Sequence, residues 1–133
     1  MNVVLEDNEI ELRTDVEGII NTYDIYLKKT NEHIGYVVYR GYHYDVMLGD
    51  MGAVVYTKYR GHNYAFKAIK LISELLNEND IDNYWLVCDK YNIASKALIE
   101  KLGPKNRSLT IGNKYLFFEC KTIEKDRKSN LQI

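Results

Sequence analysis

The sequence contains little proline, little cysteine and no histidine cluster, and each shortage excludes a class of protein. Proline occurs once, at Pro104, and cysteine twice, at Cys88 and Cys120. Neither cysteine belongs to a CxxC pair and both lie in apolar runs, so we expect two reduced core thiols. The three histidines have no metal-ligand spacing, and we therefore predict no metal site.

Long apolar runs and an excess of positive charge are also missing. No stretch approaches the roughly 20 apolar residues that a membrane helix needs, and no basic segment with an apolar run opens the chain. The net charge of −1 gives no general attraction to nucleic acid or to an anionic membrane. We expect a cytoplasmic protein of one domain, residues 1–133, with no nucleic acid and no membrane among its partners.

What the chain does have is hydrophobic residues, 46% of the total, and 12 tyrosines. Four of these tyrosines crowd one stretch, at Tyr36, Tyr39, Tyr42 and Tyr44. Tyrosine suits half-buried strands, so packing explains this cluster, and a surface that binds substrate is the alternative.

The first half of the chain is rich in strand patterns. Residues 2–5 and 9–13 form a hairpin, or only the second is a strand. Thr14 and Asp15 are suited to cap a short helical turn through residue 20, which Gly18 weakens. Residues 23–29 and 33–40 alternate in polarity and predict an antiparallel hairpin. A loop over residues 41–49 then leads to a buried strand over 50–56.

Two helices follow, each after a strand. Asn63 is placed to cap a helix over 64–79 through its side chain. The apolar run 84–88 predicts a strand buried on both faces. Asn92 caps a helix over 93–102, which Gly103 and Pro104 end. The apolar faces of these helices are expected to be Ala65, Ala68, Ile69, Ile72, Leu75 and Leu76, and then Ala94, Ala97, Leu98 and Leu102.

The chain closes with two more strands, residues 107–111 and 114–121, around the turn Gly112-Asn113. The charged tail, 124–133, is expected to fray. The two strands on either side of the first helix should be parallel neighbours. Their following loops, 56–65 and 88–92, then converge beyond the carboxyl ends of the sheet, where ligands bind in open α/β arrangements. The first backbone N–H groups of the helix after 63 favour an anion such as a phosphate.

Two motifs resemble the signatures of the GNAT superfamily of acetyl-CoA-dependent N-acetyltransferases. Residues 59–65, Tyr-Arg-Gly-His-Asn-Tyr-Ala, resemble its Arg/Gln-x-x-Gly-x-Gly/Ala loop. Residues 92–103 resemble its Asn-x-x-Ser/Ala-x-x-Leu-Tyr-x-Lys-x-Gly-Phe motif, and residues 50–52 resemble the entry to its central strand. Together the resemblance covers about residues 23–121 and implies an α/β (α+β) fold. That fold is a mixed, mostly antiparallel twisted sheet with a central parallel strand pair and two main helices.

The resemblance also implies a cofactor site. Acetyl-CoA would place its pyrophosphate on the amides of residues 60–65 and its pantetheine arm along the end of the central strand. The amide of Val55, or a neighbour, would polarise the thioester carbonyl. The implied cofactor-binding residues are Val54, Val55, Tyr56, Arg60, Gly61, His62, Asn63, Tyr64, Ala65, Asn92, Ser95 and Lys96.

Three positions depart from the family pattern. Asn63 replaces a glycine of the family pattern. Asparagine tolerates the left-handed backbone conformation expected at this position. Ile99 stands where the family often has an acid tyrosine, and Pro104 replaces a phenylalanine. Tyr91 is the substitute acid, although a thiolate also leaves without one. Asp50 is the candidate base; the alternatives are a solvated strand-end carboxylate and a base acting through water.

The front of the chain, residues 1–21, is short for this family and has room for at most one helical turn. The acceptor site should therefore be open, or completed by a second copy in a homodimer. An open site suits an amine on a small molecule, a peptide or a protein. The leading hypothesis is direct acetyl transfer in a ternary complex. A non-catalytic acyl-CoA-binding or regulatory module, or a domain that binds no cofactor, are the alternatives.

Overall fold

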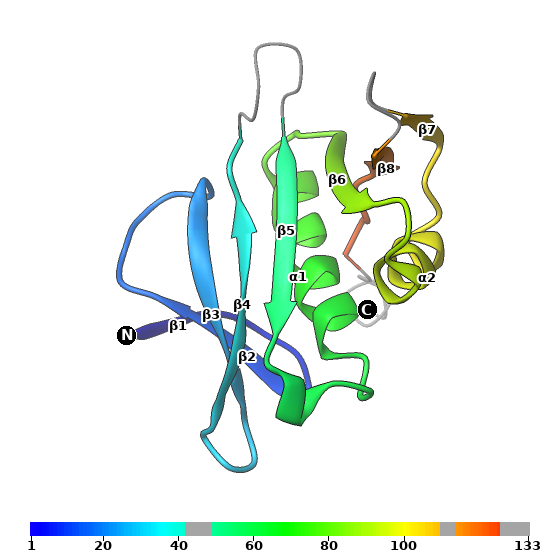
Figure 1. The fold of residues 1–133 in the computed structure, drawn as a ribbon. Coiled ribbons are helices and arrows are strands. Elements are labelled where there is room, and N and C mark those ends of the chain that lie inside the picture. Colours follow the sequence, from blue (N-terminus) through cyan, green and yellow to red (C-terminus); the bar gives the residue numbers. More distant parts are fainter. Residues whose placement is uncertain (42–48, 110–113, 126–133) are drawn as a thin grey trace, which may run out of the picture.

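One mixed sheet forms the centre of the molecule (Figure 1). The computed structural model of the chain describes residues 1–41, 49–109 and 114–125, and within these ranges the sheet has eight strands in the order β1-β2-β3-β4-β5-β6-β8-β7. Neighbours are antiparallel except β5 and β6, which are parallel. The strands are β1 Asn2–Glu6, β2 Ile10–Thr14, β3 Asn21–Leu27, β4 His33–Tyr39, β5 Asp50–Val55, β6 Asn83–Asp89, β7 Asn106–Leu109 and β8 Tyr115–Lys121.

The predicted fold class is therefore confirmed, and so is the hairpin of β3 and β4. At the front, β1 and β2 pair, which decides for the hairpin over a single strand. The helical turn proposed for residues 15–20 is wrong, because this segment has no helix. The Thr14 hydroxyl instead accepts a hydrogen bond from the Val16 backbone at 3.2 Å, and Gly18 has a φ of 98°. These two features favour a turn over a helix.

The helix α1, Tyr64–Glu78, covers one face of β1, β2, β4 and β5 and lies behind the sheet in Figure 1. Its apolar stripe packs on the inward side chains of the strands, such as Leu12, Ile25 and Val37, to form the core. The expected stripe is buried at Ala68, Ile69, Ile72 and Leu76, whereas Ala65 and Leu75 are half-buried. No helix among the described residues covers the opposite face of β2 to β5 (Figure 1).

The second strand-helix unit differs from its prediction in two respects. Burial alternates along β6, with Tyr84, Leu86 and Cys88 buried and their neighbours half-buried, so the strand is not buried on both faces. The cap of α2, Ile93–Lys101, is confirmed, because Asn92 Oδ1 accepts from the Ser95 backbone at 3.1 Å. Its predicted apolar side is confirmed only in part: Leu98 and Leu102 are half-buried and pack against the core, whereas Ala94 and Ala97 are exposed and Ile99 is buried instead.

The reason for this difference is that α2 is short and packs mainly on β6, so only the side chains on its β6 side are removed from solvent. Gly103 ends the helix with a φ of 66°, as predicted. Several predictions lie outside the described residues: the roles of Tyr42 and Tyr44, the turn at Gly112-Asn113 and the tail beyond residue 125. No helix in the described part of the chain is long and apolar enough to cross a membrane.

At Gly35, β4 and β5 approach each other too closely for a side chain. A Cβ placed on Gly35 would lie 2.0 Å from the Val54 carbonyl oxygen and 2.9 Å from Val55 Cα. We predict that Gly35→Ala separates the two strands and lowers the free energy of unfolding by about 1–3 kcal/mol. Thermal denaturation would show a melting temperature several degrees lower.

A matched control for Gly35→Ala is Gly18→Ala, since a Cβ at Gly18 meets no atom within 4 Å. That substitution carries only the cost of a positive φ. A melting temperature of Gly35→Ala equal to that of the unsubstituted protein would contradict this account of the strand contact.

Candidate active site

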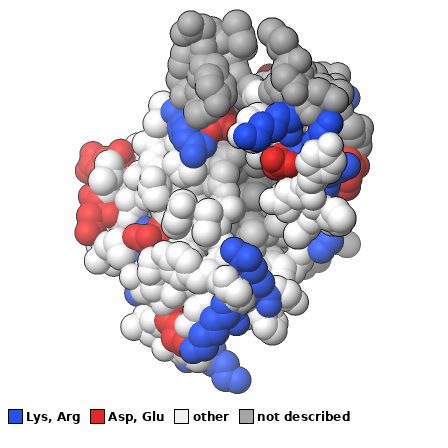
Figure 2. All heavy atoms as spheres, viewed as in Figure 1, with Lys and Arg blue, Asp and Glu red and all other residues white. Residues whose placement is uncertain are grey.

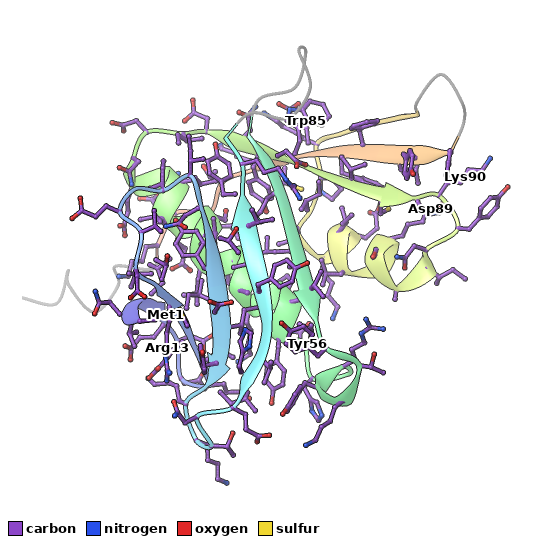
Figure 3. All side chains as sticks on the ribbon, turned by 60° about the vertical axis from the view of Figure 1, so that its left-hand side comes forward. Met1, Arg13, Tyr56, Trp85, Asp89 and Lys90 are labelled. Carbon is purple, nitrogen blue, oxygen red and sulfur yellow. The ribbon has the colours of Figure 1, made fainter. Side chains whose placement is uncertain are left out.

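The central feature of the site is the separation of β5 from β6. The two strands pair only where Asp50 meets Trp85 and Met51 meets Leu86, and beyond these pairs they diverge. Figure 3 marks the carboxyl ends of the separated strands by Tyr56 and Asp89. The space between them is a cleft of about 470 Å³, lined by Met51, Gly52, Ala53, Val54, Val55, Tyr59, Arg60, Gly61, Asn63, Tyr64, Ala65, Ile69, Leu86, Val87, Asn92, Ala94, Ser95, Leu98 and Ile99.

Backbone groups of β5 face this cleft. The Arg40 N–H donates to the Asp50 carbonyl and the Tyr56 N–H to the Ile34 carbonyl, both across the β4–β5 ladder. In an antiparallel ladder the N–H groups of successive residues point to alternate sides. The N–H groups of Ala53 and Val55 therefore point away from β4 and into the opening, where β6 no longer pairs with them.

The loop after β5 shapes the open end of the cleft. It consists of a turn of 3-10 helix, Thr57–Tyr59, and the residues that lead into α1. The left-handed backbone expected at Asn63 is present, with φ 70° and ψ 17°, and Gly61 is also left-handed with φ 88°. Arg60 Nε donates to the Val55 carbonyl at 2.9 Å, which ties this loop to the end of β5.

The proposed side-chain cap by Asn63 is wrong. Asn63 occupies the N-cap position, but its side chain makes no capping hydrogen bond, because the left-handed backbone turns it away from the helix. Asn63 Oδ1 accepts instead from Lys101 Nζ at 3.0 Å. The first N–H groups of α1 are thereby left without a side-chain cap, which is the arrangement that suits an anionic ligand.

Lys101 contacts Asn63 of the cleft lining and is not among the binding residues that the sequence predicts. It lies at the end of α2, yet its contact with Asn63 brings a positive charge to the start of α1, 38 residues away in the chain. Its Nζ also lies 5.9 Å from the Phe66 ring centroid. Figure 2 shows Lys and Arg side chains beside the central hollow on the side of this loop. Only the tertiary fold joins the two helices here, so no local pattern reveals the pair.

The structure brings most of the predicted cofactor residues to the cleft and leaves three outside its lining. Tyr56 is 40% exposed at the end of β5, and the His62 ring stacks on Tyr64 with centroids 5.4 Å apart. Lys96 is half-buried near Cys88. Those that line the cleft are Val54, Val55, Arg60, Gly61, Asn63, Tyr64, Ala65, Asn92 and Ser95.

Neither candidate proton-transfer group lines the cleft. Tyr91 is 78% exposed on the loop after β6, with Lys90 Nζ 5.0 Å from its ring centroid. Asp50 is only 3% exposed, so its alternative interpretation as a solvated strand-end carboxylate is wrong. Its carboxylate forms an ion pair with Arg40, whose side chain is 43% exposed.

Cys88 and Cys120 are buried and form no disulfide. Burial raises the pKa of the Cys88 thiol, which keeps it protonated and makes it a poor nucleophile. Among the described residues, no group of three or more His, Cys, Asp or Glu side chains is arranged to hold a metal ion.

Sequence reasoning missed much of the apolar wall of the cleft. Ile69 of α1 and Leu98 and Ile99 of α2 line it, as do Leu86 and Val87 of β6. The parallel pairing of β5 and β6 predicts two facing walls, but only the register shows where the strands separate. Ile99 is 3% exposed, so the position of the family's tyrosine holds a packed side chain in this chain.

The sequence matches the family model for the acetyltransferase (GNAT) domain over residues 5–105. A search of curated protein sequences finds no match. Solved structures do match. The GNAT-family acetyltransferase from Bacillus anthracis is 19% identical with a TM-score of 0.61, covering 76% of this chain and 66% of that one. The putative ribosomal-protein-serine acetyltransferase from Vibrio cholerae is 21% identical with a TM-score of 0.58, covering 75% and 63%.

A third similar structure is the NatC complex bound to Gag peptide and CoA, with 23% identity and a TM-score of 0.58, covering 77% of this chain and 70% of that chain. The chain spans slightly less than two thirds of the Bacillus anthracis and Vibrio cholerae chains. At identities below 25%, these structural matches show a shared fold. Because the family match extends over about three quarters of the sequence, the chain belongs to the GNAT acetyltransferase family.

Proposed function

We propose that the protein transfers an acetyl group from acetyl-CoA to an amine, directly and within a ternary complex. One observation carries the proposal: the N–H groups of Ala53 and Val55 face a cleft that ends at the uncapped start of α1. A thioester carbonyl and a phosphate are both acceptors of N–H hydrogen bonds, and acetyl-CoA carries both at opposite ends of one arm. The cleft offers donors at both places.

Different residues of the cleft would contact different parts of acetyl-CoA. The backbone of residues 60–65 and the cations Arg60 and Lys101 would hold the pyrophosphate. The pantetheine arm would lie along residues 54–56, and Asn92 and Ser95 would contact it from the start of α2. The Val55 amide would stabilise the charge that develops on the thioester oxygen during attack. Acetyl-CoA supplies the activated acyl group, whose thiolate leaving group needs no dedicated acid.

The face of β2 to β5 that no described helix covers supports an open acceptor site. Two similar structures are named for a ribosomal-protein-serine acetyltransferase and for a complex bound to a peptide, which supports a peptide or protein amine as acceptor. A small-molecule amine is the alternative. Cytoplasmic location and a homodimer stay predictions.

Acetyl-CoA binding is the first test. Saturation at about 100 times the dissociation constant stabilises the native state by about 2.7 kcal/mol, so the melting temperature should rise by several degrees. Release of CoA thiol in the presence of amines then measures transfer. If acetyl-CoA does not change the melting temperature, the protein binds no cofactor, and this result contradicts the proposal. Binding without thiol release across peptide and small-molecule amines identifies a non-catalytic acyl-CoA-binding module.

Lys101 provides a second test. We expect Lys101→Met to weaken acetyl-CoA binding about 3- to 10-fold and to reduce its salt dependence, because one cation near the phosphates is lost. Asn63→Gly keeps the left-handed backbone and should reproduce part of the loss, since Lys101 is then no longer held. Lys70→Met, at an exposed position on α1, is the control. Equal affinities of all three variants would remove Lys101 from the site.

Asp50 provides a third test. Its carboxylate is buried and paired with Arg40, so accepting a proton from an ammonium would break that pair. We expect Asp50→Asn to raise the KM for the acceptor while the pH dependence of kcat/KM keeps its shape, with water carrying the proton away. Loss of the limb that rises with pH in the variant would instead make Asp50 the base.

A further inference from the structure

The ion pair of Arg40 and Asp50 lies at the closed end of the cleft. Asp50 begins β5 opposite Trp85, at the place where β5 and β6 are still paired. Arg40 follows β4, and its backbone N–H donates to the Asp50 carbonyl at 2.9 Å, so the two residues face each other across the ladder. Arg40 Nη1 pairs with Asp50 Oδ2. The anion-binding loop of residues 60–65 lies at the opposite end of the same strand.

The guanidinium lies next to the cleft. Gly52 follows Asp50 by two residues, so both belong to the same face of β5. A Cβ on Gly52 would lie 3.8 Å from Arg40 Nη1, and Gly52 lines the cleft. Because Gly52 has no side chain, nothing on this strand separates the guanidinium from the place where an acceptor must approach the acyl group.

The two charges of the pair are unequally exposed. The Asp50 side chain is 4% exposed and the Arg40 side chain 43%. Among the described residues, Nε and Nη2 of Arg40 form no hydrogen bond or ion pair, and the side chain as a whole is exposed. A pair that only joined β4 to β5 would have no need of an arginine whose second edge is free. That edge has the planar two-donor geometry that binds a carboxylate with two parallel hydrogen bonds.

We propose that Arg40, held in place by Asp50, binds a carboxylate of the acceptor, so that the acceptor is an amine that also carries a carboxylate group. This inference rests on acetyl transfer in the neighbouring cleft. With the phosphates held at the open end, the acyl group points toward Gly52 and the guanidinium. An acceptor that presents its amine to the acyl carbon then brings a nearby carboxylate to Arg40. Asp50 is a positioning residue, since it touches the guanidinium and not the acceptor.

Binding of product-like probes tests the site without any turnover. The protein, with CoA present, is titrated with N-acetylglycine and with N-acetylglycinamide, which differ only in the carboxylate. The Arg40 side-chain Nε resonance, assigned from its loss in Arg40→Lys, should shift with the acid and not with the amide. If the chemical shift of the Arg40 resonance changes with neither probe, or changes equally with both, the proposal is overturned even if the enzyme acetylates amines.

Thiol release adds a kinetic measurement with matched acceptors, namely amino acids and their amides, and peptides with Glu or Gln beside the terminal amine. We expect kcat/KM to favour the carboxylate member about tenfold or more, mainly through KM. Arg40→Gln should abolish this preference, and Arg40→Lys should retain only part of it because the two-donor edge is lost. A preference that survives Arg40→Gln contradicts the proposal.

The control is Arg13→Gln, which removes an arginine from β2, far from β5 and β6 in Figure 3. It should leave the preference intact. If Arg40→Gln unfolds because the buried Asp50 carboxylate loses its ion pair with Arg40, the double variant Arg40→Gln and Asp50→Asn removes both charges and keeps the test. Failure of acetyl-CoA to bind any variant or the unsubstituted chain would refute the proposed function, whereas the probe titration decides the carboxylate site separately.

Discussion

The cleft depends on one constraint, which is that β5 and β6 are each paired over more positions with their outer neighbours than with each other. β4 pairs with β5 along five positions, and β8 pairs with β6 along seven, whereas β5 and β6 share two. Gly35 lets β4 approach β5 more closely than any residue with a side chain allows. The inner edges therefore separate after Met51. Unpaired backbone groups in such an opening need a partner, and a ligand rich in hydrogen-bond acceptors is the partner that suits N–H groups.

The uncapped N–H groups at the start of α1 add further donors at the end of the cleft where an anion would bind. A glycine at position 63 would give the loop its left-handed turn with no side chain. Asn63 gives the same turn and adds an amide, which the structure uses to hold Lys101. Asn63 thus keeps a phosphate from approaching the backbone as closely as a glycine would allow, but it holds an additional cation, Lys101, beside the loop. That cation comes from the end of α2, so the pair also connects the two helices that border the cleft.

The sequence was sufficient for most of the elements, although not for the segment 15–20, because hydrophobic alternation, the Asn92 cap and the Gly103 stop are local signals. It failed where tertiary contacts decide. Asn63 looked like a cap since asparagine usually caps, but its backbone conformation turned the side chain toward Lys101. The apolar side of α2 was only partly predicted, because Leu98 and Leu102 pack against the core but Ile99, rather than Ala94 or Ala97, is the buried residue. The alternative interpretation of Asp50, a solvated strand-end carboxylate, failed because no local pattern reveals its ion pair with Arg40.

The absence of a helix over β2 to β5 among the described residues determines how an acceptor can be recognised. Helices that wall a pocket supply side chains from several directions, whereas a bare sheet face supplies them only perpendicular to the strands and at fixed spacing. On the row formed by Arg13, Asp24, Tyr36 and Val54, Arg13 pairs with Glu11 and Asp24 with His33. Recognition of a charged acceptor group then falls to a residue whose partner lies buried beneath it. Arg40 meets this condition, because its Nη1 pairs with the buried Asp50 and also lies near Gly52 of the cleft lining.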